Sequence, residues 1–208
     1  MHAIVWRFDQ LESIGGRRTV TEGHPQLIAT PAGKAVLFNG VDDALLVDQH
    51  PLAGAQTFTI EAVFRPDGGA FEQRWLHLAE ADPVNGEAQS PRILFEVRAI
   101  EDKWYLDAFT TGPGYNKALA VPEKTFPAGR WYAVQQTFDG KTYRSYVGGV
   151  LQAEDAIDFK AHRAGRCSVG MRINRVSYFR GAVLEVRFTP RALSPAEFAA
   201  LPAGLNAR

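Results

Sequence analysis

The sequence contains one cysteine, Cys167, and that scarcity removes several classes of protein from consideration. A single thiol allows no internal disulfide and no cysteine-rich zinc site. Cys167 precedes Val169 and Met171 in an apolar pattern, which is typical of a small buried residue rather than a nucleophile. The histidines are scattered without metal-ligand spacing, and no nucleophile elbow, phosphate loop or dinucleotide fingerprint occurs. The sequence therefore predicts no metal centre and no catalytic residue of these kinds.

Neither sign of charge is in excess, because Lys plus Arg and Asp plus Glu each number 23. Nucleic-acid binding normally requires a basic surplus, so nucleic acid is not expected as the main partner. No run approaches the ~18 apolar residues of a membrane span. The chain enters strand-like sequence at Ala3 without a charged leader and an apolar segment. We expect no membrane span, and the location is left open between the cytoplasm and export (the periplasm included) after removal of a leader.

Helical periodicity is absent before residue 190, and short apolar/polar alternation takes its place. In residues 57–65, Phe58, Ile60, Ala62 and Phe64 share one face of a strand, and polar side chains occupy the other. Asp139-Gly140 predicts a tight hairpin. The same alternation predicts strands at residues 36–38, 44–47, 74–79, 93–99, 104–109, 131–138, 143–147, 167–173 and 182–188.

The fold class that follows is all-β, an antiparallel two-sheet β-sandwich of the jelly-roll kind. Only the end of the chain is expected to be helical: Ser194, Pro195 and Glu197 have the capping-box arrangement of a short C-terminal helix. No repeat, linker or low-complexity tract divides the sequence. Residues 1–208 are therefore predicted to form one domain.

Three stretches in the same order resemble the laminin G-like branch of the concanavalin A-like lectin/glucanase superfamily. They read VLFNGVDDALLV with FTIEAVFRP (36–66), GRWYAVQQTFDGKTYRSYVGG from Gly129, and FRGAVLEVRFTPRALSPAEF from Phe179. The opening WRFD at Trp6 also fits. The resemblance implies a concanavalin A-like fold, with Trp131 and Phe138 as large side chains between the sheets. It implies function less firmly, because this sandwich supports lectins, adhesive modules, glucanases and lyases.

A structural calcium ion is not favoured. Members of this branch often carry Asp-Glu in the closing strand, where the Asp helps to bind calcium, and this chain has Leu184-Glu185. A calcium ion would need oxygen ligands from Asp9, Asp42 or Asp43 instead. Aspartates that stabilise their own turns are the simpler interpretation. We expect no cofactor.

If the apolar side of each strand faces the core, the opposite sides are unusually charged. Glu61 with Arg65 and Glu185 with Arg187 are examples. The residue types suit a concave sheet face that binds hydroxyl and carboxylate groups of a sugar. The predicted ligand-binding residues are Arg65, His77, Glu96, Arg98, Asp107, Arg172, Asn174 and Tyr178. We expect a noncatalytic module that recognises a carbohydrate or, second, a protein surface; the alternative on the same residues is a solvated surface of cross-strand ion pairs.

Two enzyme hypotheses use the same face. A glycoside hydrolase needs two carboxylates ~5 Å apart, which Glu61 with Glu96 or Asp107 would supply only from neighbouring strands. The run from Glu96 to Glu101 lacks the Asp that laminarinase-type enzymes place two residues after the first Glu. A polysaccharide lyase would use His77 as base, Arg98 as neutraliser and Tyr178 as acid, by an imperfect resemblance to jelly-roll alginate lyases. Convergence of these three side chains would distinguish a lyase from a binding module.

Overall fold

The computed structural model describes residues 2–206, which fold into two antiparallel sheets packed face to face. The eight-stranded sheet contains β1 (Ile4–Arg7), β4 (Gln26–Thr30), β5 (Gly33–Asn39), β7 (Phe58–Pro66), β13 (Tyr132–Phe138), β14 (Thr142–Val147), β15 (Val150–Ala156) and β17 (Arg180–Thr189). The nine-stranded sheet contains β2 (Ser13–Ile14), β3 (Arg17–Glu22), β6 (Ala44–Val47), β8 (Glu72–Ala81), β9 (Ala88–Ile100), β10 (Lys103–Gly112), β11 (Tyr115–Ala120), β12 (Phe126–Pro127) and β16 (Gly165–Val169). The predicted two-sheet sandwich is confirmed.

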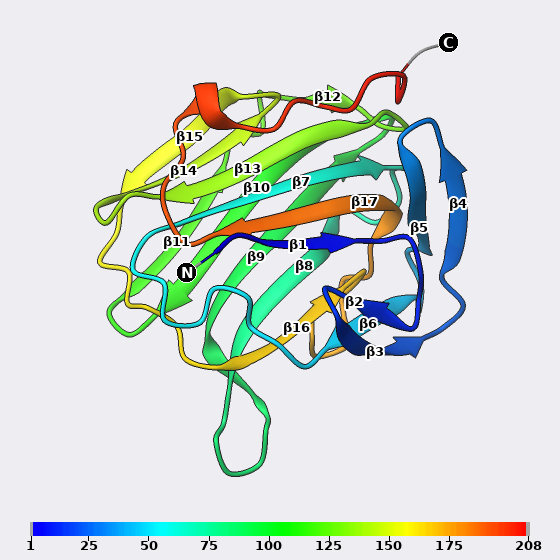
Figure 1. Cartoon of the computed structure of the whole chain (residues 1–208). Coiled ribbons are helices and arrows are strands. Elements are labelled where there is room, and N and C mark those ends of the chain that lie inside the picture. The colour runs from blue at the N-terminus through cyan, green and yellow to red at the C-terminus, as the bar shows by residue number, and fades with distance from the viewer. Residues whose placement is uncertain (1, 207–208) are drawn as a thin grey trace.

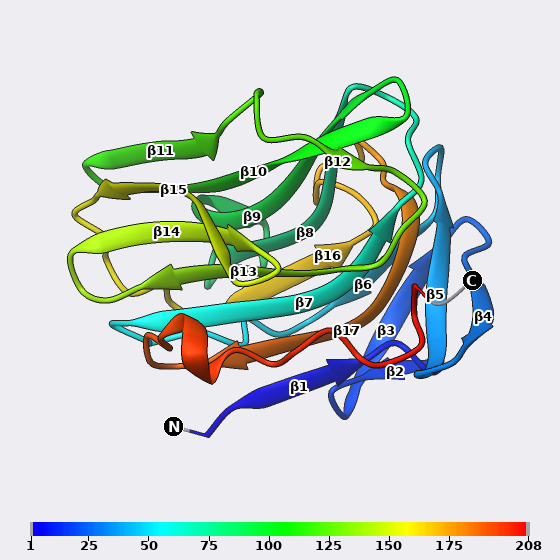
Figure 2. The ribbon, with the colours of Figure 1, turned by 90° about the horizontal axis from the view of Figure 1, so that it is seen from above.

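The order of strands in each sheet is far from their order in the chain. In the eight-stranded sheet β7 lies between β13 and β17, and in the nine-stranded sheet β8 lies between β9 and β16. Figure 1 shows the eight-stranded sheet in front of the other, and Figure 2 shows the two layers from above. The hairpin between β8 and β9 extends away from the sandwich at the bottom of Figure 1.

The inward faces of both sheets form one apolar core, as the alternation in sequence predicts. Phe64 from the eight-stranded sheet stacks on Trp75 at 5.0 Å between ring centroids and meets Trp104 edge-on at 5.2 Å. A polar contact also crosses the core, because the Gln136 amide donates to the carbonyl oxygen of Leu94 at 2.8 Å. Cys167 is fully buried in this core, and burial raises the pKa of its thiol. The predicted role of Cys167 as a small core residue is confirmed.

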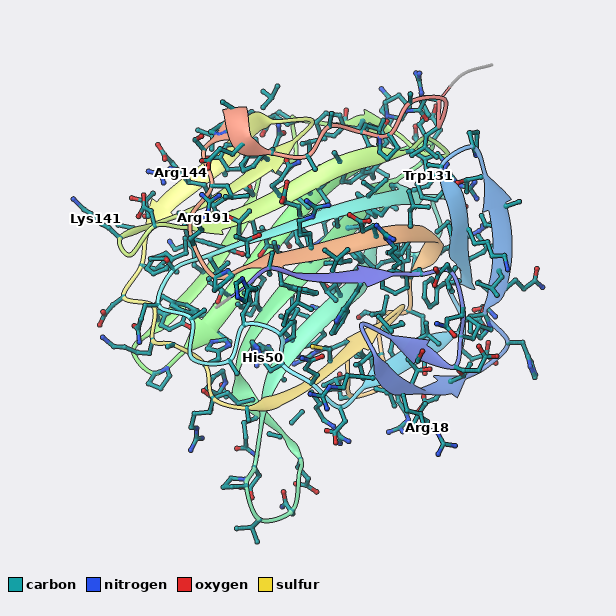
Figure 3. All side chains as sticks on the ribbon, in the orientation of Figure 1. Arg18, His50, Trp131, Lys141, Arg144 and Arg191 are labelled. Atoms are coloured by element: carbon teal, nitrogen blue, oxygen red, sulfur yellow. The ribbon has the colours of Figure 1, made fainter. Side chains whose placement is uncertain are left out.

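Trp131 corrects the expectation that it lies between the sheets. It belongs to a second apolar cluster with Ala182, Leu184 and Leu205, on the outer side of the eight-stranded sheet. The amide of Asn206 donates to the Trp131 carbonyl oxygen, and the Asn206 side-chain oxygen accepts from the Trp131 N–H, both at 2.9 Å. Figure 3 labels Trp131 beside the C-terminal segment. The segment after residue 193 therefore covers the outer side of this sheet.

The predicted C-terminal helix is wrong in extent. Pro195–Glu197 forms one 3-10 turn, in which the Glu197 carboxylate accepts from the Ser194 N–H at 2.9 Å. The capping box is present, but Phe198 is extended and packs edge-on against Tyr146, so the turn does not continue. The predicted strand at 167–173 also ends early, at Val169, because Gly170 adopts a positive φ of 91°. Within residues 2–206 no helix has the length and apolar character that a membrane crossing requires.

Candidate functional site

Four of the eight predicted site residues, His77, Glu96, Arg98 and Asp107, lie together on the outer side of the nine-stranded sheet. We call this surface the charged face and define it by seven side chains from three adjacent strands: Glu72, Arg74 and His77 of β8, Arg92, Glu96 and Arg98 of β9, and Asp107 of β10. Their cross-strand register is direct, since Glu72 pairs with Arg98, Arg74 with Glu96, and Glu96 with Asp107. Period-two geometry places them opposite the core residues Phe95, Val97 and Leu106.

Arg98 is the centre of an ion-pair network on the charged face. Its Nε and Nη2 donate to one Asp107 oxygen at 2.9 and 2.7 Å, and Nη2 also donates to Glu96 at 3.0 Å. Its Nη1 binds Glu72. Arg74 donates from Nε to Glu96 at 3.1 Å and from Nη1 to Ser177 Oγ at 2.6 Å. Three carboxylates therefore surround Arg98, which leaves it little capacity to bind a ligand.

Glu96 is buried despite its position on the outer side of the sheet. Its side chain is 3% exposed, and that of Asp107 is 5% exposed. Burial, and then the negative charge of Asp107, raise the pKa of Glu96 to about 7. One oxygen of Asp107 is buried and has no hydrogen-bond partner among residues 2–206. The Glu96 and Asp107 carboxylates of the network are therefore shielded from water, whereas the Glu72 side chain is 42% exposed.

Two aromatic rings accompany the arginines of this face. The guanidinium carbon of Arg98 lies 5.7 Å from the centroid of Phe71, and that of Arg92 lies 5.3 Å from the centroid of Phe109. Phe71 is 56% exposed, although phenylalanine is among the residues most often buried, and it belongs to neither apolar cluster of the described residues. Flat aromatic faces can stack on sugar rings, and neighbouring guanidinium groups can donate to the sugar hydroxyls.

His77 connects the charged face to the turn after β16. Its Nδ1 accepts from the backbone N–H of Ile173 at 3.1 Å, so the turn that begins at Arg172 is fixed to β8. The turn is closed by a hydrogen bond from the Arg172 N–H to the Val176 carbonyl oxygen at 3.0 Å. Burial, and then the charges of Arg92, Arg172 and Arg74, lower the pKa of His77 to about 3. Arg172 is therefore close to the charged face, although it is distant in sequence.

Asn174 and Tyr178 lie in or next to the same turn but differ in their exposure to solvent. Asn174 is exposed at its tip, and Tyr178 is half-buried where the chain enters β17. No hydrogen bond joins Tyr178 to His77 or Arg98 among the described residues, and Arg98 is occupied by carboxylates. Arg98 is therefore not free to neutralise a substrate carboxylate, as the lyase hypothesis requires.

Arg65 lies on the other sheet and does not belong to the charged face. It is on β7, where it donates from Nε and Nη2 to the two oxygens of Asp67, both at 2.8 Å, and lies over Trp131 at 5.5 Å. Glu61 of the same strand accepts from the Ala199 N–H at 2.7 Å. The hypothesis that Glu61 pairs with Glu96 or Asp107 is therefore wrong, because the sandwich core separates them.

Arg92 is a residue of this face that the sequence reasoning missed, since the predicted strand began one residue later. It follows Pro91, and β9 extends back to Ala88. The alternation itself contained the signal: Arg92 is in phase with Glu96 and Arg98, whereas Ile93, Phe95 and Val97 face the core.

The aspartates considered for calcium stabilise a turn instead. Asp43 accepts from the backbone N–H of His24 at 2.7 Å and from that of Asn39 at 2.9 Å. Asp42 accepts from the Asn39 side chain at 2.7 Å. Residues 2–206 contain no group of three or more His, Cys, Asp or Glu side chains placed to hold a metal ion.

Several cavities lie away from the charged face. One of about 530 Å³ is lined by residues of the sheet rim, including Asn39, Asp43, Arg65 and Arg180. Two others, of about 580 and 620 Å³, lie between the C-terminal segment and the eight-stranded sheet. None of these three cavities is lined by a residue of the charged face. A ligand of the charged face would therefore bind on the surface of the sheet rather than in one of these cavities.

A model of the concanavalin A-like lectin/glucanase superfamily matches residues 39–199. No curated protein sequence matches the chain.

Among solved structures, domain 4 of the extracellular arabinanase AbnA from Geobacillus stearothermophilus, in complex with arabinotriose, is similar with a TM-score of 0.69 and 15% identity, over 94% of this chain and 96% of that one. The receptor-binding domain of botulinum neurotoxin D is similar with a TM-score of 0.65 and 11% identity, over 93% of this chain and 50% of that one. The NanB sialidase from Streptococcus pneumoniae is similar with a TM-score of 0.59 and 15% identity, over 73% of this chain and 25% of that one. At such identities the similarity concerns the fold.

Proposed function

The chain belongs to the concanavalin A-like lectin/glucanase superfamily, and from that premise we propose that it is a noncatalytic carbohydrate-binding domain that uses the charged face. The observation that carries the proposal is the division of roles on this face. Glu72, Glu96 and Asp107 are all held by Arg98, while the ring of Phe71 next to it remains exposed. A fixed polar platform with a free aromatic ring suits reversible contact with a sugar, because little side-chain entropy is lost on binding.

The solved structures support the ligand class without identifying the ligand. The arabinanase domain was solved with arabinotriose. Cell entry of botulinum neurotoxin C, a solved structure of which is similar with a TM-score of 0.63 and 10% identity, depends on interaction with two ganglioside molecules. Both of those ligands are carbohydrates or carry one. A protein surface is the second candidate ligand, and binding to glycans in the absence of any protein separates the two.

Hydrolysis is the catalytic alternative on the same residues. Glu96 and Asp107 are opposite each other on neighbouring strands, and a pKa of about 7 for Glu96 would suit a general acid. Both carboxylates are almost fully buried and are bound by Arg98, so a glycosidic oxygen has no access to them. We therefore expect no turnover, and reducing-sugar release that is lost in Glu96→Gln would overturn the noncatalytic assignment.

The binding experiment uses affinity electrophoresis of the purified chain through gels that contain arabinan, laminarin, polygalacturonate or heparin. We expect retardation by at least one polymer, and Phe71→Ala should weaken that binding about tenfold, the effect of one lost stacking anchor. Val150→Ala is the matched control, since Val150 is an exposed apolar residue (66%) on a strand of the other sheet. Binding that depends on Val150 and not on Phe71 would place the ligand elsewhere. Retardation by none of the polymers would count against the proposal.

A further inference from the structure

One end of the charged face has hydrogen-bond donors without acceptors. The Nε2 of His77 and the Nε of Arg92 are buried and have no partner among residues 2–206. Because Nδ1 of His77 accepts from Ile173 and the ring is neutral, its proton is on Nε2, which is therefore a donor. Arg92 makes one side-chain hydrogen bond in the structure, from Nη1 to the Ser90 carbonyl oxygen at 3.1 Å. Buried donors without acceptors are rare in folded proteins, so each of these two donors requires an explanation.

The register brings these donors together with Arg172. His77 is opposite Leu94, and Arg92 lies two residues from Leu94 on the same face, so His77 and Arg92 are diagonal neighbours on β8 and β9. The residue opposite Arg92 on β8 is Ala79, which offers no carboxylate to the guanidinium. Arg172 is the neighbour of Ile173, whose N–H is bound by His77, so the turn holds Arg172 close to this end of the charged face.

No carboxylate neutralises this group of charges. Neither Arg92 nor Arg172 forms an ion pair with a described residue, in contrast to Arg74 and Arg98. Burial, and then the charge of Arg172, lower the pKa of Arg92, which indicates that the two guanidinium groups repel each other. The negative charge of Glu96 raises the pKa of Arg92, but the Glu96 carboxylate accepts hydrogen bonds from Arg74 and Arg98 instead.

We propose that the guanidinium groups of Arg92 and Arg172, next to the buried ring of His77, form a binding site for the oxyanion of an acidic glycan, either the carboxylate of a uronic acid or a sulfate ester. The inference rests on the proposed carbohydrate-binding function and adds the ligand class. An oxyanion presents several acceptor oxygens at once, and guanidinium groups bind such oxygens in a bidentate manner. Phe109, with Arg92 over its ring at 5.3 Å, provides an apolar surface next to the charge for the carbon skeleton of the sugar.

The test compares two arginines of the same turn. Arg172→Gln removes a proposed ligand contact, whereas Arg175→Gln removes the same charge from a side chain that is 63% exposed and already paired with Glu22 at 2.6 Å. Arg92→Gln is the second site variant. Binding of the full chain to polygalacturonate, heparin and neutral arabinan is measured by isothermal titration calorimetry, and thermal melting confirms that each variant is folded.

We expect at least one of the two acidic polymers to bind and arabinan to bind more weakly. The preferred polymer identifies the anion as a carboxylate or a sulfate. Arg172→Gln and Arg92→Gln should each weaken acidic-polymer binding about tenfold or more, and Arg175→Gln should change it less than about twofold, because screened surface charges contribute little.

Three outcomes would overturn the inference. If Arg175→Gln weakens binding as much as Arg172→Gln, the attraction is unspecific. If arabinan binds and neither acidic polymer does, the oxyanion site is wrong while the carbohydrate-binding function stands. If no polymer binds, the proposed function fails and the inference fails with it.

Discussion

Glu96 and Asp107 lie directly opposite each other on β9 and β10, and a single nitrogen, Nη2 of Arg98, donates to both at 3.0 and 2.7 Å. Two carboxylates so close would repel each other without that shared cation, and both are removed from water. Arg98, which the sequence favoured as a ligand contact, therefore has a structural role in holding the charged face together.

Replacing Arg98 should destabilise the protein strongly. Arg98→Met leaves two buried carboxylates without their common partner, for which we expect a loss of about 3–5 kcal/mol in the free energy of unfolding, measured by urea denaturation. Arg144→Met is the control, because Arg144 binds Asp139 and Glu154 at the exposed edge that Figure 3 labels. That change should cost less than about 1 kcal/mol. Equal losses would show that the Arg98 network contributes no more than a surface pair.

Glu96 should give stability a dependence on pH with a defined sign. Its pKa is raised from 4.5 to about 7 in the folded protein, so between these values the folded state binds the extra proton. The contribution of Glu96 is therefore complete below pH 4.5 and is lost as the pH rises through 7. Relative to wild type, Glu96→Gln should gain about 3 kcal/mol in unfolding free energy between pH 4.5 and 8. A difference between the two proteins that does not vary with pH would contradict the raised pKa.

Three buried histidines should make the protein less stable as the pH falls, the opposite of the effect of Glu96. The pKa is lowered from 6.5 to about 3 for His50, about 3 for His77 and about 4 for His162, in each case chiefly by burial. His162 is hydrogen-bonded through Nδ1 to His50 Nε2 and through Nε2 to the Tyr115 hydroxyl, both at 3.2 Å. Both ring nitrogens of His162 therefore have partners while the two histidines are neutral.

As the pH falls below about 6.5 the unfolded chain takes up protons that the folded protein excludes, and stability decreases. Each histidine should contribute up to about 2 kcal/mol of loss between pH 6.5 and 5, seen as a lower urea midpoint. His162→Gln should reduce this slope relative to wild type. Identical slopes in wild type and His162→Gln would refute the assignment.

Chelation should not affect thermal stability. Asp43 uses its two oxygens on the N–H groups of His24 and Asn39, which leaves no pair of free aspartate oxygens at this turn. We expect the same melting temperature with and without EDTA, and Asp43→Ala should cost about 1–3 kcal/mol because two N–H groups lose their acceptor. A melting temperature that falls with EDTA and recovers with calcium would reveal a metal site.

The sequence by itself determined the elements of this fold. Alternation such as that of residues 57–65 and the Asp139-Gly140 hairpin depend on local backbone geometry, so they could be interpreted without knowledge of the partner strands. The capping box at Ser194 was identified for the same reason. Its continuation into a helix was not decided locally, because Phe198 packs on Tyr146 instead.

The tertiary structure alone decided which charged strands share a face. Glu61 and Glu96 are both outward-facing residues of regular strands, and only the pairing of β7 with β13 and β17 places Glu61 on the opposite side of the molecule. Non-local contacts also put Trp131 outside the core, in a cluster with Ala182 and Leu205. A strand's side chains alternate whatever its neighbours are, but its position in a sheet depends on contacts between residues far apart in the chain. For that reason the fold class could be predicted from the residues, whereas the division between an ion-paired platform and a group of free donors could not.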